Sequence, residues 1–241
     1  MIEPQEKIIM TSIREELSTI VRTRCKVLVA GGGIAGIAAA LAAARGGADV
    51  LLVEREYLPG GLSTLGLVTI YLPLCDGMGN QLSFGIAEEL LKLSVLYGAE
   101  GPMPDAWLRA SPIEDRKKRR FDVTFNPHLF ALAAEKRLCK NGVKILYGTT
   151  VVSVHKDGRK VDAVIVENKS GRYAIQVDGA VVDCTGDADV CYMSEEDTAI
   201  HAKGNLLAAW YYATDGKKVG LNSLGVCDTT EEEKTGLEEP P

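Results

Sequence analysis

The stretch KVLVAGGGIAGIAAALAAARGGADVLLVER, residues 26–55, decides the fold of this chain. An apolar run ends at three consecutive glycines, a run of small residues follows, and a second apolar run ends at Glu54. These patterns predict a buried strand over 25–30, a helix over 34–45 and a second buried strand over 48–53. Two buried strands joined by a helix pair in parallel, so the stretch predicts a strand–helix–strand unit of an α/β protein.

The glycines of this stretch have the spacing G-x-G-x-x-G. Gly31 permits a tight turn, Gly33 lets a pyrophosphate approach the backbone, and Gly36 lets the helix pack closely on the strand. The first helical turn then presents N–H groups and the positive end of the helix dipole to the phosphates. Glu54 can accept both hydroxyls of an adenosine ribose and would repel a 2′-phosphate. We therefore predict a dinucleotide site, and a glycine-rich turn without a ligand is the alternative.

The rest of the chain predicts further helices and strands. Helical spacing of apolar residues predicts an N-terminal amphipathic helix over 5–22 and a helix over 83–97, with Ser83 as its N-cap. Another helix is expected to begin at the cap Asn126, with Pro127 in its first turn, and to end at Gly142.

Several apolar runs follow that last helix. The run VKILYG predicts a strand, and VVSV, VDAVIVE and YAIQV, separated by turn residues, predict a three-stranded antiparallel meander. One more buried strand, GAVVDC, leads into TGDADV. Beyond residue 191 the periodicity weakens.

Composition narrows the class of protein. The 241 residues are 46% hydrophobic and 25% charged, and the net charge is −6. This balance disfavours binding to nucleic acid or to anionic membranes, and no zinc-type, P-loop or kinase spacing is present. The six cysteines form no CxxC pair, so we expect free thiols in a reducing compartment. With no apolar segment typical of a secretory signal or a membrane span, a cytoplasmic protein is expected, without a metal.

The glycine loop alone does not separate NAD from FAD. The later features are Gly60–Gly61 followed by LSTLG, then YGTTVVSV, and then AVVDCTGDADV. Together they resemble the flavoprotein fold of the glutathione reductase type, over about residues 24–100 and 120–192. The chain is similar to the FAD-dependent oxidoreductases, which include relatives of fumarate reductase flavoproteins and of the flavin subunit of heterodisulfide reductase. This likeness implies an α/β, Rossmann-like domain with a central parallel sheet, an antiparallel three-stranded meander and non-covalent FAD.

The resemblance also implies contacts with FAD, residue by residue. The implied contacts are Gly31, Gly33, Ile34, Ala35 and Gly36 for the pyrophosphate; Glu54, with Arg55 beside it, for the ribose; Val151 for adenine; Gly61, Leu62, Ser63 and Thr64 on the flavin side; and Thr185, Gly186 and Asp187 in a second glycine-containing turn. Simpler interpretations remain open. Arg55 can be a solvated cation, Val151 a strand residue, Ser63 and Thr64 turn formers, and Asp187 a helix cap.

The resemblance divides the chain into three parts. These are an N-terminal helix in 1–23, an FAD-binding domain over 24–192 with an irregular insertion at about 98–120, and the start of a substrate or cap segment at 193–241 with a flexible acidic tail. The family's C-terminal return segment is not recognisable, so we expect a truncated gene product or a divergent short form. Apolar surface left uncovered would favour a homo-oligomer.

The expected activity is transfer of a hydride or electrons between FAD and a small-molecule substrate or an electron-transfer partner. Two alternatives remain: an NAD-binding oxidoreductase domain, and a nucleotide-binding module without turnover. No catalytic side chain is assigned, because the flavin itself carries the redox chemistry. His201 and Cys75 are minor candidates, and the basic run RKKRR at 116–120 is expected to be a solvated surface.

Overall fold

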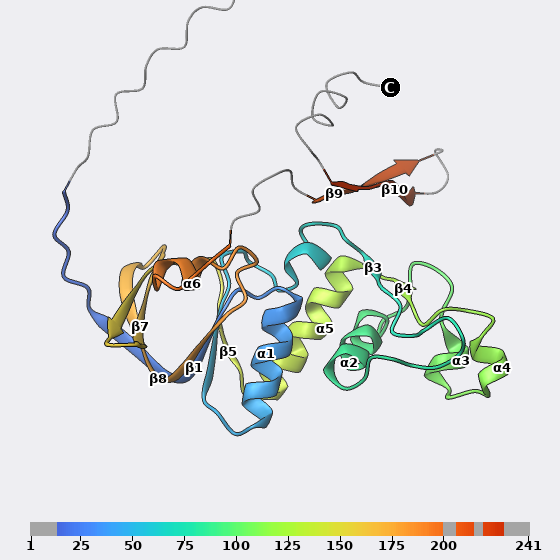
Figure 1. Ribbon diagram of the computed structural model, residues 1–241, viewed down its shortest axis with the longest axis horizontal. Coiled ribbons are helices and arrows are strands. Elements are labelled where there is room, and N and C mark those ends of the chain that lie inside the picture. Colours follow the sequence, from blue (N-terminus) through green and yellow to red (C-terminus); the bar gives the residue numbers. More distant parts are fainter. Residues whose placement is uncertain (1–13, 200–205, 215–218, 229–241) are drawn as a thin grey trace, which may run out of the picture.

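The computed structural model describes residues 14–199, 206–214 and 219–228. Its main sheet has six strands in the order β5-β2-β1-β8-β7-β6 (Figure 1). β1, β2, β5 and β8 are parallel, and β6, β7 and β8 form an antiparallel meander. The strands are β1 (Val21–Ala30), β2 (Val50–Val53), β5 (Lys144–Leu146), β6 (Thr150–Asp157), β7 (Lys160–Asn168) and β8 (Gly171–Asp183). The predicted α/β class, parallel sheet and meander are confirmed.

A single long strand, β8, joins the parallel sheet to the meander. The sequence predicts two strands here, YAIQV and GAVVDC, but the chain continues without a break for 13 residues. The first half of β8 pairs antiparallel with β7, and most of its length pairs parallel with β1. Gly179 makes this possible, because a Cβ at that position would lie 2.5 Å from the carbonyl oxygen of Lys26.

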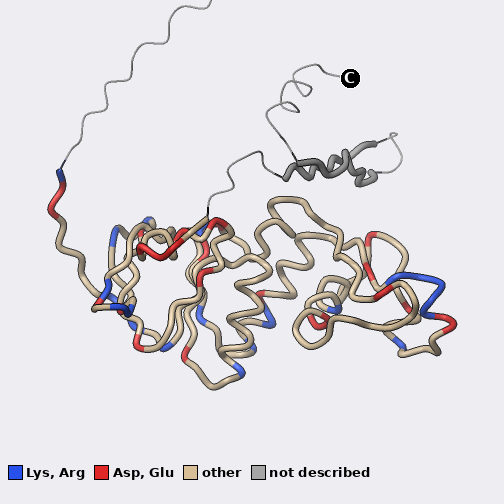
Figure 2. Tube along the Cα trace, viewed as in Figure 1, with Lys and Arg blue, Asp and Glu red and all other residues tan. Residues whose placement is uncertain are grey.

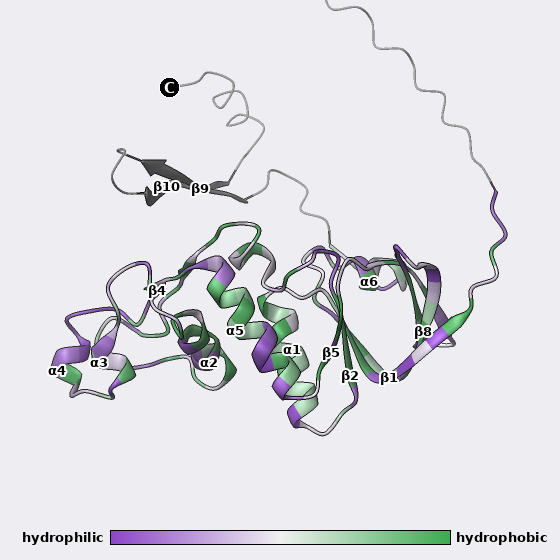
Figure 3. Ribbon diagram, turned by 180° about the vertical axis from the view of Figure 1, so that it is seen from behind, coloured by the Kyte–Doolittle hydropathy of each residue, from purple (hydrophilic) through white to green (hydrophobic). Residues whose placement is uncertain are grey.

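The sheet is covered on both faces, which explains why β2 and the second half of β1, residues 27–30, are apolar. Side chains alternate in a strand, so Val29 and Leu52 pack with the helices while Leu28 and Leu51 pack with the meander. The helices are α1 (Ile34–Arg45), α2 (Ile86–Ser94) and α5 (Pro127–Lys140). Figure 3 shows hydrophobic residues concentrated along the strands and on the helices beside them.

The helix ends follow the predicted signals in α5 but not in α2. The side chain of Asn126 accepts hydrogen bonds from the backbone N–H groups of His128 and Leu129, both at 3.1 Å. Gly142, with φ +79°, follows the last turn of α5. The predicted N-cap Ser83 is wrong: α2 begins after Gly85, because the N–H of Ser83 is bonded to the carbonyl of Leu74 within the preceding loop.

The predicted N-terminal helix is wrong over its described part. Residues 14–20 have no regular structure, and β1 begins at Val21, four residues before the predicted strand. Val21 pairs with Ala174 of β8, whose N–H donates to the carbonyl of Ile20 at 2.9 Å. An amphipathic helix that is not packed on other elements is only marginally stable, so pairing with β8 is favoured instead. Residues 1–13 lie outside the described residues.

The remaining elements are short, except for a two-stranded antiparallel sheet formed by β9 (Leu206–Thr214) and β10 (Val219–Asp228). The short ones are η1 (Gly61–Ser63), β3 (Ile70–Tyr71), α3 (Asp105–Leu108), α4 (Ile113–Arg116), β4 (Val123–Thr124) and α6 (Asp189–Met193). Within the basic run, Lys117 and Lys118 pair with Glu114 and Asp115, and Figure 2 shows a basic stretch beside an acidic one near α4. The predicted acidic tail lies outside the described residues from position 229 onward. In the described part, no helix is long and apolar enough to cross a bilayer.

Candidate functional site

Three turns meet at the carboxyl edge of the parallel sheet. We call residues 31–36 the first turn, 60–64 the second turn and 185–188 the third turn; they follow β1, β2 and β8. The N–H of Gly60 donates to the carbonyl of Gly32 at 2.8 Å, and a Cβ on Gly31 would lie 3.1 Å from Cα of Thr185. Turns far apart in the sequence therefore form one surface, at the edge where α/β sheets bind ligands.

Two glycines of the first turn, Gly31 and Gly36, are packed too closely to carry a side chain. Gly31 has φ +96°, and a Cβ there would lie 2.3 Å from the carbonyl oxygen of Cys184. A Cβ on Gly36 would lie 1.8 Å from the carbonyl oxygen of Gly31. Gly33 differs, because nothing lies within 4 Å of its Cβ position. Two glycines thus shape the turn, and the third leaves open space in front of it.

The amino end of α1 suits an anion. Gly33 is the N-cap and has no side chain to make a capping hydrogen bond. The first helical residues of α1 include no acidic residue. The first N–H groups of a helix lack acceptors within the helix, and the dipole favours negative charge there. With the open space at Gly33, these features fit a pyrophosphate.

Glu54 is buried at the end of β2, with 6% of its surface exposed. One carboxylate oxygen accepts from the N–H of Gly32 at 2.6 Å, and the other from the N–H of Glu56 at 2.8 Å. A carboxylate has about four acceptor positions, so capacity remains for two hydroxyls. Arg55, by contrast, is exposed, and its Nε lies 3.5 Å from a carboxylate oxygen of Glu56.

The backbone leading into β6 runs beside Glu54. The N–H groups of Gly148 and Thr149 donate to the carbonyls of Glu56 and Glu54, at 3.0 and 3.1 Å. Val151 follows two residues later, is half-buried, and pairs with Val166 of β7. The strand that carries Val151 therefore begins next to the end of β2.

The second turn uses its hydroxyl groups internally. Oγ of Ser63 donates to the carbonyl of Gly60 at 2.7 Å, and Oγ1 of Thr64 donates to that of Pro59 at 3.1 Å. Both side chains are buried, which agrees with their interpretation as turn formers. Gly61 lies against the first turn, since its Cβ position is 3.2 Å from Cα of Gly33, and Leu62 is 74% exposed.

The third turn depends on a residue that the sequence analysis did not single out. Asp183, the last residue of β8, accepts hydrogen bonds from the N–H and hydroxyl of Thr185 and from the N–H of Cys191. Asp187 is exposed and does not cap α6, whose N-cap is Ala188. A short acidic residue two positions before a turn was the available signal, because such side chains bond to the backbone two residues ahead.

Cys75, one of the two minor catalytic candidates, has a structural contact, because its Sγ accepts from the N–H of Phe121 at 3.2 Å. Two groups that were not candidates are also structural: burial raises the pKa of the Cys25 thiol to about 11, and His155 pairs with Asp162 on the meander. The five cysteines whose side chains the structure describes are free thiols, as predicted. His201 lies outside the described residues.

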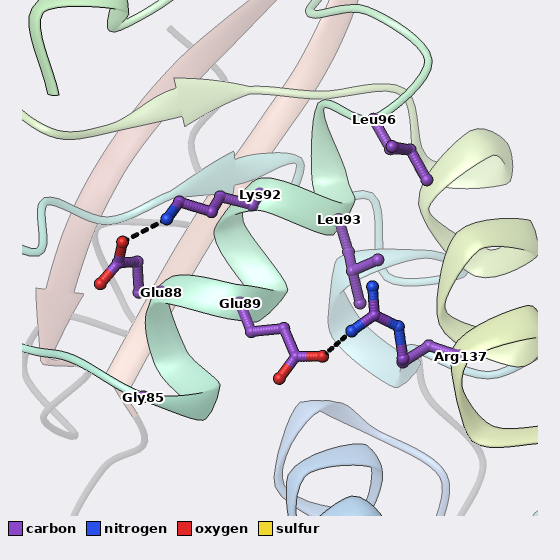
Figure 4. A pocket seen from close by; sticks show the side chains of 7 residues that line it. All are labelled: Gly85, Glu88, Glu89, Lys92, Leu93, Leu96 and Arg137. Carbon is purple, nitrogen blue, oxygen red and sulfur yellow. Dashed lines mark hydrogen bonds and ion pairs between the residues drawn. The ribbon is translucent and has the colours of Figure 1, made fainter. Parts of the chain in front are cut away.

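The hollows on the described part of the chain include two of about 360 and 440 Å³. One, of about 440 Å³, lies between α2 and α5 (Figure 4); its cations Lys92 and Arg137 are paired with Glu88 and Glu89, and it contains none of the predicted site residues. The other, of about 360 Å³, is lined by Asp187 and other residues of α6 and the third turn. The second hollow adjoins the third turn and is also lined by residues 197–199, and none of its lining residues belongs to the first or second turn.

Comparison with solved structures agrees with this architecture. L-proline dehydrogenase from P. horikoshii has a TM-score of 0.52 at 16% identity, covering 82% of this chain and 63% of that one. A geranylgeranyl bacteriochlorophyll reductase-like protein from Thermoplasma acidophilum has a TM-score of 0.50 at 16% identity, covering 79% and 46%. At these identities the likeness concerns the fold alone.

Comparison with protein sequences identifies the family. Tryptophan 2-halogenase from Chondromyces crocatus is 32% identical over 56% of this chain and 25% of its own length. A probable electron transfer flavoprotein-quinone oxidoreductase from Escherichia coli K12 is 30% identical over 65% of this chain and 36% of its own. The match thus spans about a quarter to a third of these relatives. The family model for FAD dependent oxidoreductase matches residues 26–209. The chain therefore belongs to the FAD-dependent oxidoreductase family, and the predicted cofactor FAD is confirmed.

Proposed function

We propose that this chain binds FAD in an extended form across the three turns and serves as the cofactor domain of an oxidoreductase. The main support for this proposal is the open space at Gly33, which is flanked by Gly61 on one side and by the amino end of α1 on the other. When bound, FAD would supply transfer of a hydride or of electrons. The residues of this chain would bind FAD and orient it, and the amino end of α1 would stabilise the negative charge of its phosphates.

The ADP half of FAD is assigned to the first turn and Glu54. Its pyrophosphate would face Gly33, with the N–H groups of Ile34, Ala35 and Gly36 directed at it. The free acceptor positions of Glu54 would take the ribose hydroxyls, with Arg55 at the solvent side. Backbone groups of Val151 would bind the adenine, because β6 begins beside Glu54.

The flavin half of FAD is assigned to the other two turns. The backbone from Gly61 to Thr64 would run past it, with the hydroxyls of Ser63 and Thr64 holding that turn in shape. Thr185, Gly186 and Asp187 would pass it on the opposite side. Gly186 leaves room for this, because nothing lies within 4 Å of its Cβ position.

The reaction partner in this proposal is a small molecule or an electron-transfer protein. Several large apolar side chains beyond the second turn are exposed, including Leu72 at 74% and Phe84 at 64%. Such surface favours coverage by a substrate domain or by a second copy of the chain, and light scattering would report the latter. The free thiols support a reducing, cytoplasmic location.

Absorbance spectroscopy of the purified protein tests the proposal. We expect added FAD to bind, its visible bands to bleach with dithionite, and ADP to compete with it. FMN, which lacks the AMP moiety of FAD, should compete poorly. A protein that binds neither FAD nor ADP would refute the assignment. Binding of NADH alone would favour an NAD domain, and a bound flavin that no donor reduces would favour a module without turnover.

A further inference from the structure

The carboxylate of Asp183 ties together the end of β8, the third turn and α6. One of its oxygens accepts from the N–H of Thr185 at 3.0 Å and from its hydroxyl at 2.7 Å. The other accepts from the N–H of Cys191 at 2.9 Å. Oγ1 of Thr185 in turn accepts from the N–H of Asp189 at 2.9 Å. A chain of four hydrogen bonds therefore begins at one side chain.

The third turn has a backbone that needs such support. Gly186 has φ +98° and Ala188 has φ +59°, so two residues of this turn are in the left-handed region. That region is unfavourable for a residue with a Cβ, such as Ala188. Helix α6 is only five residues long and has no side-chain cap. The hydrogen bonds to Asp183 offset these costs and hold the turn in one conformation.

The first turn does not depend on the same side chain. Backbone pairing fixes the end of β8 against β1, since the N–H of Cys184 donates to the carbonyl of Ala30 at 2.8 Å. Gly31 packs directly on the carbonyl of Cys184, which this pairing holds in place. Loss of the Asp183 carboxylate would therefore release the third turn and leave the first turn intact.

Asp183 remains a charged acceptor at neutral pH. Burial acts to raise its pKa, but the hydrogen bonds donated by Cys191 and Thr185 outweigh burial, and the pKa is lowered overall. An ionised carboxylate accepts at both oxygens, as this arrangement requires.

We propose that Asp183 is a positioning residue that sets the third turn for the flavin half of FAD. The ADP half depends instead on the first turn and Glu54. This inference rests on the proposed function and adds that two different carboxylates serve the two halves of FAD. Glu54 serves the ADP half, and Asp183, acting through Thr185, serves the flavin half. Asp183 itself would not touch the cofactor.

Calorimetric titration of the full chain with FAD and with ADP tests this division. The variants are Asp183→Ala, Asp183→Asn and Thr185→Val, with Asp178→Ala as control, because Asp178 lies on the same strand with its side chain 41% exposed. Asp183→Ala should raise the FAD Kd about tenfold and change the ADP Kd less than about twofold. Asp183→Asn should have a smaller effect, because its amide keeps an acceptor for Thr185 but directs a donor at the N–H of Cys191.

The ratio of the two affinities separates positioning from folding. Thr185→Val removes the bridging hydroxyl at constant size, so it should weaken FAD selectively even if Asp183→Ala does not fold. Unchanged FAD binding in Asp183→Ala would overturn the inference. If Asp183→Ala does not fold, unchanged FAD binding in both Thr185→Val and Asp183→Asn would overturn it. Equal losses for FAD and ADP would also overturn it, because they indicate a structural role alone. A wild-type chain that binds neither ligand would refute the proposed function, and this inference with it.

Discussion

Replacing Gly36 by alanine tests how closely α1 packs on the first turn. The added Cβ would lie 1.8 Å from the carbonyl oxygen of Gly31, whereas real Cβ contacts are essentially never shorter than 3.0 Å. The obstacle is backbone, so either the helix or the turn must shift by more than an ångström. Overpacking of this kind costs about 1–3 kcal/mol, and the better helix propensity of alanine returns about 1 kcal/mol at most.

Because the clash is with backbone, the cost should lie at the upper end of that range, about 3 kcal/mol. The net loss should then be about 2 kcal/mol, which lowers Tm by about 4–8 °C for a domain of this size. Thermal unfolding followed by circular dichroism, without FAD, measures it. Gly33→Ala is the matched control, because nothing lies within 4 Å of its Cβ position and its φ of −66° suits any residue. Its Tm without ligand should change by less than about 2 °C, since the cap penalty and the reduced entropy of the unfolded chain nearly cancel.

The two variants should separate folding from binding. Gly33→Ala places a methyl group where the pyrophosphate is proposed to lie, so its FAD Kd should rise about 10- to 100-fold despite the unchanged Tm. If Gly36→Ala melted like the wild type, the close approach of α1 to Gly31 would be wrong. If Gly33→Ala bound FAD normally, the pyrophosphate would lie elsewhere.

Three other predictions follow from charged and nucleophilic groups. Glu54→Gln should raise the Kd for ADP about tenfold in calorimetry, because its amide directs a donor at a backbone N–H; unchanged ADP binding would remove Glu54 from the site. The pKa of Glu89 is lowered chiefly by its hydrogen bond with Arg45. The ionised carboxylate therefore stabilises the folded state above the unfolded pKa, and this stabilisation is lost as pH falls through the folded pKa. Glu89→Gln should accordingly lower the free energy of unfolding by about 1 kcal/mol at pH 7, and urea titrations should show a smaller loss at pH 3; an equal loss at both would contradict this origin. Cys139 is exposed and Cys25 is buried with a pKa raised to about 11, so a thiol reagent followed by peptide mass mapping should label Cys139 first, and early labelling of Cys25 would contradict its burial.

The sequence by itself determined the features that depend on local chemistry. The small-residue helix after Gly31, the buried strands on either side of it and the cap at Asn126 are recognisable because each depends on neighbouring residues alone. The glycine spacing also predicts which positions need a bare backbone, and the contacts of Gly31 and Gly36 explain why. The assignment of FAD needed the later turns as well, read together through a family resemblance.

Only the tertiary structure decided the features that depend on distant partners. β1 extends to Val21 because the edge of β8 offers hydrogen bonds that no local pattern reveals. The predicted pair of strands merges into β8 because Gly179 lets it approach Lys26 closely. The role of Asp183 is only partly local: its bonds with Thr185 lie two residues ahead, whereas its bond with the N–H of Cys191 depends on how α6 packs against the end of β8. Sequence patterns report short-range preferences, whereas the meeting of three turns at one sheet edge results from long-range pairing of parallel strands.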